Sequence, residues 1–177
     1  LTELGDTFDL YQRAMASFKR ITTLKDTRPT ITNGNSELKN FENSIVFNDV
    51  NFSYVEGFSV LNNVSVEINK GQTVAIVGST GSGKSTMIKL ILRLYDVTEG
   101  DIKFDNINIK DLDLTSLRSN IALVSQDIFL FEGSVFENIA YGNLDASEDE
   151  IWEAARLSES DDFINQLPNK EHTIVGE

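Results

Sequence analysis

The chain has 177 residues, enough for one domain of ordinary size or for one domain with an appendage. Its 15 Lys and Arg residues against 28 Asp and Glu residues give a formal charge of −13, the wrong sign for bulk attraction to nucleic acid or to an anionic membrane. The absence of cysteine excludes disulfides and thiolate metal sites, and a single histidine, His172, argues against a histidine-based metal site.

No segment of the sequence has the length or the composition of a membrane span. The longest apolar runs are far shorter than the ~20 residues that such a span requires. The first residues, "LTELGDTFDL", lack the basic start and the apolar stretch of a signal peptide. We therefore expect that this segment does not cross a bilayer by itself.

Residues 1–25 have the spacing of an amphipathic helix. Their large apolar residues recur at intervals of four, three, four and three, which places them on one stripe: Leu4, Phe8, Tyr11, Met15 and Phe18. The segment "DTRP", residues 26–29, predicts the end of this helix because proline disfavours helical backbone in the residue before it. Residues 30–43, "TITNGNSELKNFEN", are polar and typical of a linker.

From Ser44 onward the apolar period changes to two. Val50, Phe52 and Tyr54 share one face, and after a turn apolar residues alternate with polar ones over residues 64–69, which predicts two half-buried antiparallel strands. Two later runs, "TVAIV" at 73–77 and "IALV" at 121–124, are apolar throughout. Each predicts a buried strand, the first in a parallel sheet covered on both faces.

A helix is predicted from about Lys84 to Tyr95. Beyond its first turn it has only two charged side chains, Lys89 and Arg93, which lie four residues apart on one side. Most of its circumference is therefore expected to be buried.

Two further elements follow from local patterns. The segment "DIKFDNINI", residues 101–109, predicts a hairpin that turns on Asp105 and Asn106. The segment "SEDEIWEAARL" predicts a helix that opens with a capping box formed by Ser147 and Glu150.

The segment "GSTGSGKST", residues 78–86, matches the P-loop pattern G-x-x-x-x-G-K-[ST]. Glycines let the backbone curl so that successive N–H groups point inward, and the helix that begins there adds its positive dipole end. Lys84 would reach the β- and γ-phosphates, and the Ser85 hydroxyl would ligate Mg²⁺. An ordinary glycine-rich turn is the alternative, but the flanking strand and helix are predicted where the motif requires them. The residues expected to wrap the phosphates are Gly78, Ser79, Thr80, Gly81, Ser82, Gly83, Lys84, Ser85 and Thr86.

Two further features narrow the class of P-loop protein. Tyr54 lies 24 residues before the P-loop, and Gln126 follows the apolar run 121–124. With these motifs the chain resembles the nucleotide-binding domain of exporter-type ATP-binding cassette (ABC) transporters. "FNDVNFSY" is similar to the strand that ends in the family's adenine-stacking aromatic, "VSQDIFLFEGSVFENIAYG" to its glutamine loop, and "TIVGE" to the segment just before its signature motif. "QRAMASFKRITTLKDTRP" resembles the cytoplasmic extension of an exporter's last transmembrane helix.

The resemblance implies an α/β fold with a P-loop NTPase (RecA-like) core, an antiparallel β subdomain and part of a helical subdomain, preceded by an amphipathic helix. It implies that residues 1–28 extend a transmembrane-domain helix, that 29–43 are a linker, and that 44–177 are a nucleotide-binding domain truncated before the signature motif. The implied partners are ATP, a transmembrane domain and a second nucleotide-binding domain, with no nucleic acid. The implied location is the cytoplasmic side of the cell membrane.

Carried over by position, the resemblance implies that Tyr54 stacks on adenine and that Gln126 approaches Mg²⁺ and the attacking water. Tyr54 has the alternative role of a cross-strand packing aromatic, and Gln126 that of a polar residue at a strand end. Phe129 and Phe131 fit either a core or a contact surface. His172 is expected at the surface.

The catalytic elements that the resemblance leads us to look for do not all occur in the sequence. The family's signature motif and the glutamate that activates water have no counterpart among these residues. We expect this segment to bind MgATP without efficient hydrolysis, and the full-length protein to be a dimeric ATPase that drives export.

Two other classes remain as alternatives. In free P-loop kinases and GTPases the P-loop usually lies near the amino terminus, whereas here 77 residues precede it. Against a DNA-repair or chromosome cassette ATPase stand the acidic balance and the exporter-like first helix.

Overall fold

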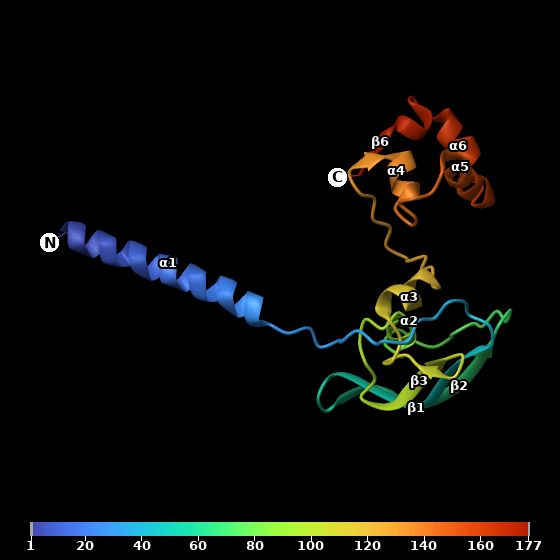
Figure 1. Ribbon diagram of the computed structural model, residues 1–177, viewed down its shortest axis with the longest axis horizontal. Helices are drawn as coiled ribbons and strands as arrows, with labels where there is room; N and C mark the ends of the chain where they lie inside the picture. The colour runs from blue at the N-terminus through green and yellow to red at the C-terminus, as the bar shows by residue number, and fades with distance from the viewer. Residues whose placement is uncertain (1, 177) are drawn as a thin grey trace. The chain divides into compact units, whose positions relative to one another are not determined.

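The computed structural model describes residues 2–176 (Figure 1). The chain divides into two compact units, Leu1–Ala122 and Leu123–Glu177. The first unit contains the P-loop and an antiparallel sheet, and the second is built mainly from short helices.

Helix α1, Thr2–Asp26, confirms the helix expected from the apolar spacing and its end before Pro29. Its apolar stripe is exposed: Phe8, Tyr11 and Phe18 each keep 60% of their surface open to solvent. Within residues 2–176, no helix combines the length and the apolar character needed to cross a membrane.

The sheet of the first unit has four strands in the order β2-β1-β3-β4, each antiparallel to its neighbour. β1 is Ser44–Val55, β2 is Phe58–Asn69, β3 is Glu99–Phe104 and β4 is Ile107–Asn108. The two predicted antiparallel strands and the hairpin predicted at 101–109 are therefore confirmed. Asp105 and Asn106 have φ values of 48° and 70°, the left-handed backbone that a two-residue turn of this twist requires.

An irregularity in β1 changes which residues face the core. The register shifts between Phe47 and Val50, next to Asp49 with a φ of 45°. Phe47 and Val50 are three residues apart, yet both are buried, which a strict period of two forbids. The extra residue is why the sequence pattern identified Val50 and Phe52 as one face but did not include Phe47.

Helices α2, Lys84–Ile91, and α3, Leu114–Ser119, contribute Leu90 and Leu117 to the same core as the sheet. The segment before β1 also belongs to this core, because Leu38 is buried and the ring of Phe41 meets the ring of Phe104 edge-on at a centroid distance of 6.1 Å. The remaining buried apolar residues of this core are Phe47, Val50, Phe52, Leu61, Val97, Ile102, Ile109 and Leu112.

Helix α2 is shorter than its apolar pattern predicts. It ends at Ile91 and not near Tyr95, because Arg93 takes a left-handed φ of 48° that no helix continues through. Lys89 is exposed as expected, whereas Arg93 is only 1% exposed. The sequence pattern therefore placed Arg93 wrongly on the exposed side of the helix. A charged residue is buried only where it has specific partners, and the pattern does not show them.

The two predicted buried strands 73–77 and 121–124 are wrong. Neither segment forms a strand within residues 2–176, and Val77 and Val124 are 86% and 97% exposed. A strand requires a neighbouring strand to receive its backbone hydrogen bonds, and no described residue pairs with either segment. Apolar composition was therefore not sufficient to define these two strands.

The second unit combines a two-stranded sheet with short helices. β5, Gly133–Ser134, pairs antiparallel with β6, Ile174–Val175. The capping box predicted at Ser147 is confirmed at the start of α5. A second box that the sequence analysis missed, Ser134 with Glu137, opens α4 and has the same S-x-x-E signature. The other elements are α4, Val135–Ala140; α5, Glu148–Leu157; α6, Asp161–Gln166; and the 3₁₀ helix η1, Lys170–His172.

Candidate functional site

The loop before α2 has the backbone that its glycines permit. Gly81 and Gly83 have φ values of 84° and 88°, a region that side chains with a Cβ disfavour. A Cβ at Gly83 would lie 2.6 Å from the Cδ2 atom of Leu61, whereas nothing lies within 4 Å of a Cβ at Gly81. Gly83 is therefore required for close packing against β2, and Gly81 leaves open space beside the loop.

The Lys84 side chain folds back over this loop. Its ammonium group donates hydrogen bonds to the carbonyl oxygens of Gly78, at 2.9 Å, and of Ser79, at 2.7 Å. The cation therefore lies against the loop backbone. A phosphate oxygen placed there would give Lys84 a charged acceptor, which makes a stronger bond than a neutral carbonyl.

The first turn of α2 also faces the loop. Its N-cap is Gly83, and among residues 2–176 no side chain caps this end of the helix. The N-terminal N–H groups of a helix lack intrahelical partners and favour anions. Ser85 is exposed, whereas Thr86 is buried. The loop and the helix start thus present a lysine, a hydroxyl and backbone donors in one short segment.

Tyr54, at the end of β1, lies beside the P-loop helix. Its hydroxyl is 3.2 Å from the Oγ1 atom of Thr86, within hydrogen-bond distance. The side chain is 44% exposed, so part of the ring is open to solvent. The structure therefore brings together two of the predicted site residues that are 32 residues apart in the sequence.

Three side chains surround the Tyr54 ring, and two of them, Tyr95 and Lys89, were not predicted beside it. Phe52 and Tyr95 meet it edge-on, with centroid distances of 4.8 Å and 5.0 Å. The Lys89 ammonium lies 5.7 Å from the ring centroid, within cation–π range. The alternating pattern had already placed Phe52 on the same face as Tyr54, but only the tertiary fold brings Tyr95 and Lys89 to the ring.

Gln126 lies in an exposed segment without regular secondary structure, in the second unit. Its predicted role at the metal stays a prediction. Phe129 is 75% exposed, and Phe131 is 44% exposed although it stacks on Tyr141 at 4.2 Å, so neither belongs to a buried core. His172 is exposed, as predicted, with 79% of its side chain open.

Comparison with known proteins relates this arrangement to one family. The family model described as "ABC transporter" matches residues 61–176, which include the P-loop and the segment around Gln126. The chain belongs to the ABC transporter family. As a member it is a nucleotide-binding segment, as the P-loop predicted.

Similar ABC transporter proteins come from distant organisms. An uncharacterized ABC transporter ATP-binding protein, YwjA, of Bacillus subtilis is 38% identical over 100% of this chain and 31% of its own length. ABC transporter B family member 24, mitochondrial, of Arabidopsis thaliana is 48% identical over 76% of this chain and 20% of its own length. The ATP-dependent lipid A-core flippase of Albidiferax ferrireducens is 45% identical over 94% of this chain and 29% of its own length.

A solved structure of a bacterial Atm1-family ABC exporter with ATP bound matches 98% of this chain with a TM-score of 0.88 and 35% identity. This match confirms the fold class and the exporter-type resemblance, and it favours them over a free kinase or a DNA-repair ATPase. The chain spans about a third or less of the length of these relatives.

Proposed function

We propose that Gly78 to Thr86 bind the phosphates of ATP and that Tyr54 stacks on its adenine. The observation that carries this proposal is the contact between Tyr54 and Thr86, because it places a partly exposed aromatic ring beside the helix that begins at Lys84. A nucleotide has a planar base and a polyanionic tail, and these two features match an aromatic ring and a P-loop. The ATP-binding names of the relatives support the same assignment.

Each residue of the site has a definable task. Lys84 would exchange its bonds to the Gly78 and Ser79 carbonyls for bonds to phosphate oxygens. The N–H groups at the start of α2 would donate hydrogen bonds to the remaining phosphate oxygens. Thr86 would hold the Tyr54 hydroxyl and so fix the direction of the ring.

A Mg²⁺ ion, when bound with the nucleotide, would neutralise phosphate charge. The exposed Ser85 hydroxyl suits it as a ligand, and Gln126 is proposed as the second protein ligand. Among the described residues, no group of three His, Cys, Asp or Glu side chains offers a metal site of its own. Metal binding should therefore depend on the nucleotide.

The test is calorimetric titration of the chain with MgATP. Lys84→Ala should raise the dissociation constant by about thirtyfold or more, because it removes charge-assisted bonds worth about 1.5–3 kcal/mol each. Tyr54→Ala should raise it less, by about three- to tenfold, because stacking adds only ~0.5–1.5 kcal/mol beyond area burial. Lys110→Ala, an exposed lysine of the same unit, is the matched control and should leave binding unchanged. Equal losses for Lys84→Ala and Lys110→Ala would refute the phosphate site.

Base selectivity gives a second readout of the same site. Stacking accepts any planar base, so ATP and GTP dissociation constants should differ by less than about thirtyfold, or ~2 kcal/mol. A gap of a thousandfold would mean that an additional group reads the edge of the base.

In the full-length protein we propose that this site belongs to the motor of an exporter. A transmembrane domain and a second nucleotide-binding domain would be its partners, and the segment would lie on the cytoplasmic side of a membrane. The 177-residue chain alone should hydrolyse ATP near background, since losing a general base and a transition-state donor typically costs ~10²–10⁴ in rate for each. Phosphate release from the chain and from the full-length protein tests this, and turnover by the chain near 1 per second that Lys84→Ala abolishes would contradict it.

A further inference from the structure

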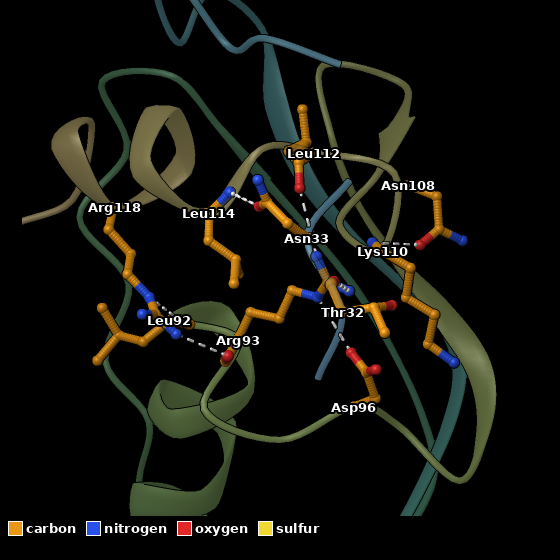
Figure 2. Close-up of polar contacts among 10 residues, drawn as sticks. All are labelled: Thr32, Asn33, Leu92, Arg93, Asp96, Asn108, Lys110, Leu112, Leu114 and Arg118. Atoms are coloured by element: carbon orange, nitrogen blue, oxygen red, sulfur yellow. Dashed lines mark hydrogen bonds and ion pairs between the residues drawn. The ribbon is translucent and has the colours of Figure 1, made fainter. Parts of the chain in front are cut away.

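Arg93, two residues after the end of α2, is the largest fully buried side chain described in the protein, at 1% exposed. A buried guanidinium is costly unless every donor finds an acceptor. Its Nε atom pairs with Asp96 at 3.1 Å, Nη1 donates to the carbonyl of Leu112 at 3.3 Å, and Nη2 donates to the carbonyl of Thr32 at 2.8 Å (Figure 2). The third of these bonds reaches the segment between α1 and the sheet.

That segment, residues 32–36, is held at the same place by backbone bonds. The N–H of Gly34 donates to the Leu112 carbonyl at 3.1 Å, so the linker and Arg93 share one acceptor. Ser36 exchanges bonds with both sides of Leu112: its N–H donates to the Asp111 carbonyl at 2.9 Å, and its carbonyl accepts from the Asp113 N–H at 2.7 Å. A side chain at Gly34 would overlap the backbone of Asp111 and Leu112, so this contact admits only glycine.

The side chain of Asn33 completes the attachment. Its amide nitrogen donates to the Asp113 carboxylate at 2.6 Å. Its oxygen accepts from the Leu114 N–H at 2.7 Å (Figure 2). Asp113 is also the N-cap of α3, where it accepts from the Ser116 N–H at 2.8 Å. The linker is therefore fastened to the start of α3 as well as to Arg93.

Arg93 follows the C-terminal end of α2, whereas the N-terminal end of α2 is Lys84, which belongs to the proposed nucleotide site. The helix has eight residues, a rigid element of about 12 Å. Arg118 holds its C-terminal end, because it donates to the carbonyls of Leu92 at 3.2 Å and Arg93 at 3.1 Å (Figure 2). One short helix thus has the P-loop at its first residue and the linker clamp just beyond its last.

We propose that Arg93 is a positioning residue that couples nucleotide binding at the P-loop to the hold on linker residues 32–36. The proposal rests on the function proposed above, and Arg93 itself touches no phosphate. Nucleotide contacts at Lys84 reduce the motion of α2. Arg93 in turn reduces the motion of the linker, through its hydrogen bonds to the carbonyls of Thr32 and Leu112. Such coupling is reciprocal, so a linker that is released weakens nucleotide binding by the same factor.

Hydrogen exchange on the full-length protein, with and without a non-hydrolysable MgATP analogue, tests the coupling at the amides of Gly34 and Ser36. In the wild type, nucleotide should slow their exchange by about threefold or more, since ligand-linked ordering is seen as protection. In Arg93→Met, which removes all the donors, exchange without nucleotide should be about tenfold faster, the equivalent of one lost charged hydrogen bond. The slowing by nucleotide should also disappear, although nucleotide still binds.

Arg93→Lys serves where Arg93→Met does not fold. Lysine keeps the charge and the reach to Asp96 but lacks the planar fork that serves two carbonyls at once. It should lose at least about half of the nucleotide-dependent protection, which a purely structural role for the charge would leave intact. Arg156→Met is the matched control, because Arg156 is an exposed arginine that pairs with Glu153 at 2.7 Å in the other unit.

The outcomes separate the two proposals. Equal nucleotide protection of Gly34 and Ser36 in the wild type and in both Arg93 variants would overturn the coupling, as would a wild-type linker that does not respond to bound nucleotide. A wild type that binds no nucleotide in a separate fluorescence titration would overturn the proposed function and the coupling with it. Unchanged linker exchange in Arg93→Met without nucleotide would overturn the clamp and the coupling that depends on it, and would leave the proposed nucleotide site standing.

Discussion

The antiparallel sheet and the two apolar segments 73–77 and 121–124 have similar side chains and opposite environments. Val50 in β1 is 0% exposed, whereas Val77 is 86% exposed. A short turn can connect two antiparallel strands, whereas two parallel strands need a longer crossover connection between them. The comparison teaches that an apolar run is stabilised by the neighbour that receives its hydrogen bonds and covers its face, and not by composition alone.

The largest expected difference is between the same substitution at these two valines. Val50→Ala should lower the free energy of unfolding by about 2–3 kcal/mol, because it leaves a cavity in a packed core. Val77→Ala should change it by less than about 0.5 kcal/mol, as expected for an exposed side chain. Denaturant unfolding followed by far-ultraviolet circular dichroism measures both. Similar losses for the two variants would show that Val77 is covered in solution.

Two glycines with the same backbone sharpen the comparison between packed and open positions. Gly57 and Gly83 have φ values of 85° and 88°, but only Gly83 has a neighbour at 2.6 Å from an added Cβ, the Leu61 methyl group. Both alanine variants carry the left-handed strain of about 1–2 kcal/mol. Gly83→Ala should cost about 1–3 kcal/mol more, through overpacking. Equal unfolding free energies for the two variants would contradict the close approach of the loop to β2.

The carboxyl of Asp105 tests how the sheet is joined to the segment before it. It accepts bonds from the N–H groups of Glu42 and Asn43 at 2.6 Å and of Ser44 at 3.0 Å. Burial raises the pKa of Asp105, but these three backbone donors and Lys70 together lower it below its ordinary 3.8. A lowered native pKa means that the unfolded chain binds the proton of Asp105 more tightly than the folded chain does. The ionised Asp105 therefore stabilises the folded state above pH 3.8, and this contribution to the free energy of unfolding is lost as the pH falls through the native pKa.

Asp105→Asn should therefore destabilise the first unit by about 1–2 kcal/mol at neutral pH, through the loss of charged acceptors. The difference from the wild type should shrink as the pH is lowered below the ordinary pKa of 3.8. Unfolding curves between neutral and acidic pH measure it. A difference that stays constant across that range would mean that the charge of Asp105 is not what holds residues 42–44.

The smallest expected effects come from the two capping boxes of the second unit. Ser134 is 9% exposed and Ser147 is exposed, although each accepts from the N–H of a glutamate three residues on. Ser134→Ala should cost about 1 kcal/mol and Ser147→Ala about 0.5 kcal/mol, the middle and the low end for such caps. Fluorescence of Trp152, the single tryptophan, reports unfolding of this unit. A larger loss for Ser147→Ala would reverse the order that burial predicts.

The sequence by itself determined the elements whose contacts are local. The helix ending before Pro29, the turn at Asp105 and Asn106 and the capping box at Ser147 all follow from interactions within a few residues. The P-loop was found for the same reason, because its glycines and Lys84 act within one short segment. Interactions between residues that are close in the chain depend on the order of those residues, so a sequence pattern is enough to predict them.

Only the tertiary structure decided which apolar and charged residues are covered. It placed Tyr54 against Thr86 and surrounded it with Tyr95 and Lys89, none of which a sequence interval specifies. It left segments 73–77 and 121–124 without strand partners among residues 2–176. It also buried Arg93, which the helical pattern assigned to an exposed side, because the acceptors at Thr32 and Leu112 come from 61 and 19 residues away in the chain. Burial and pairing depend on such distant partners, and their positions exist only once the chain has folded.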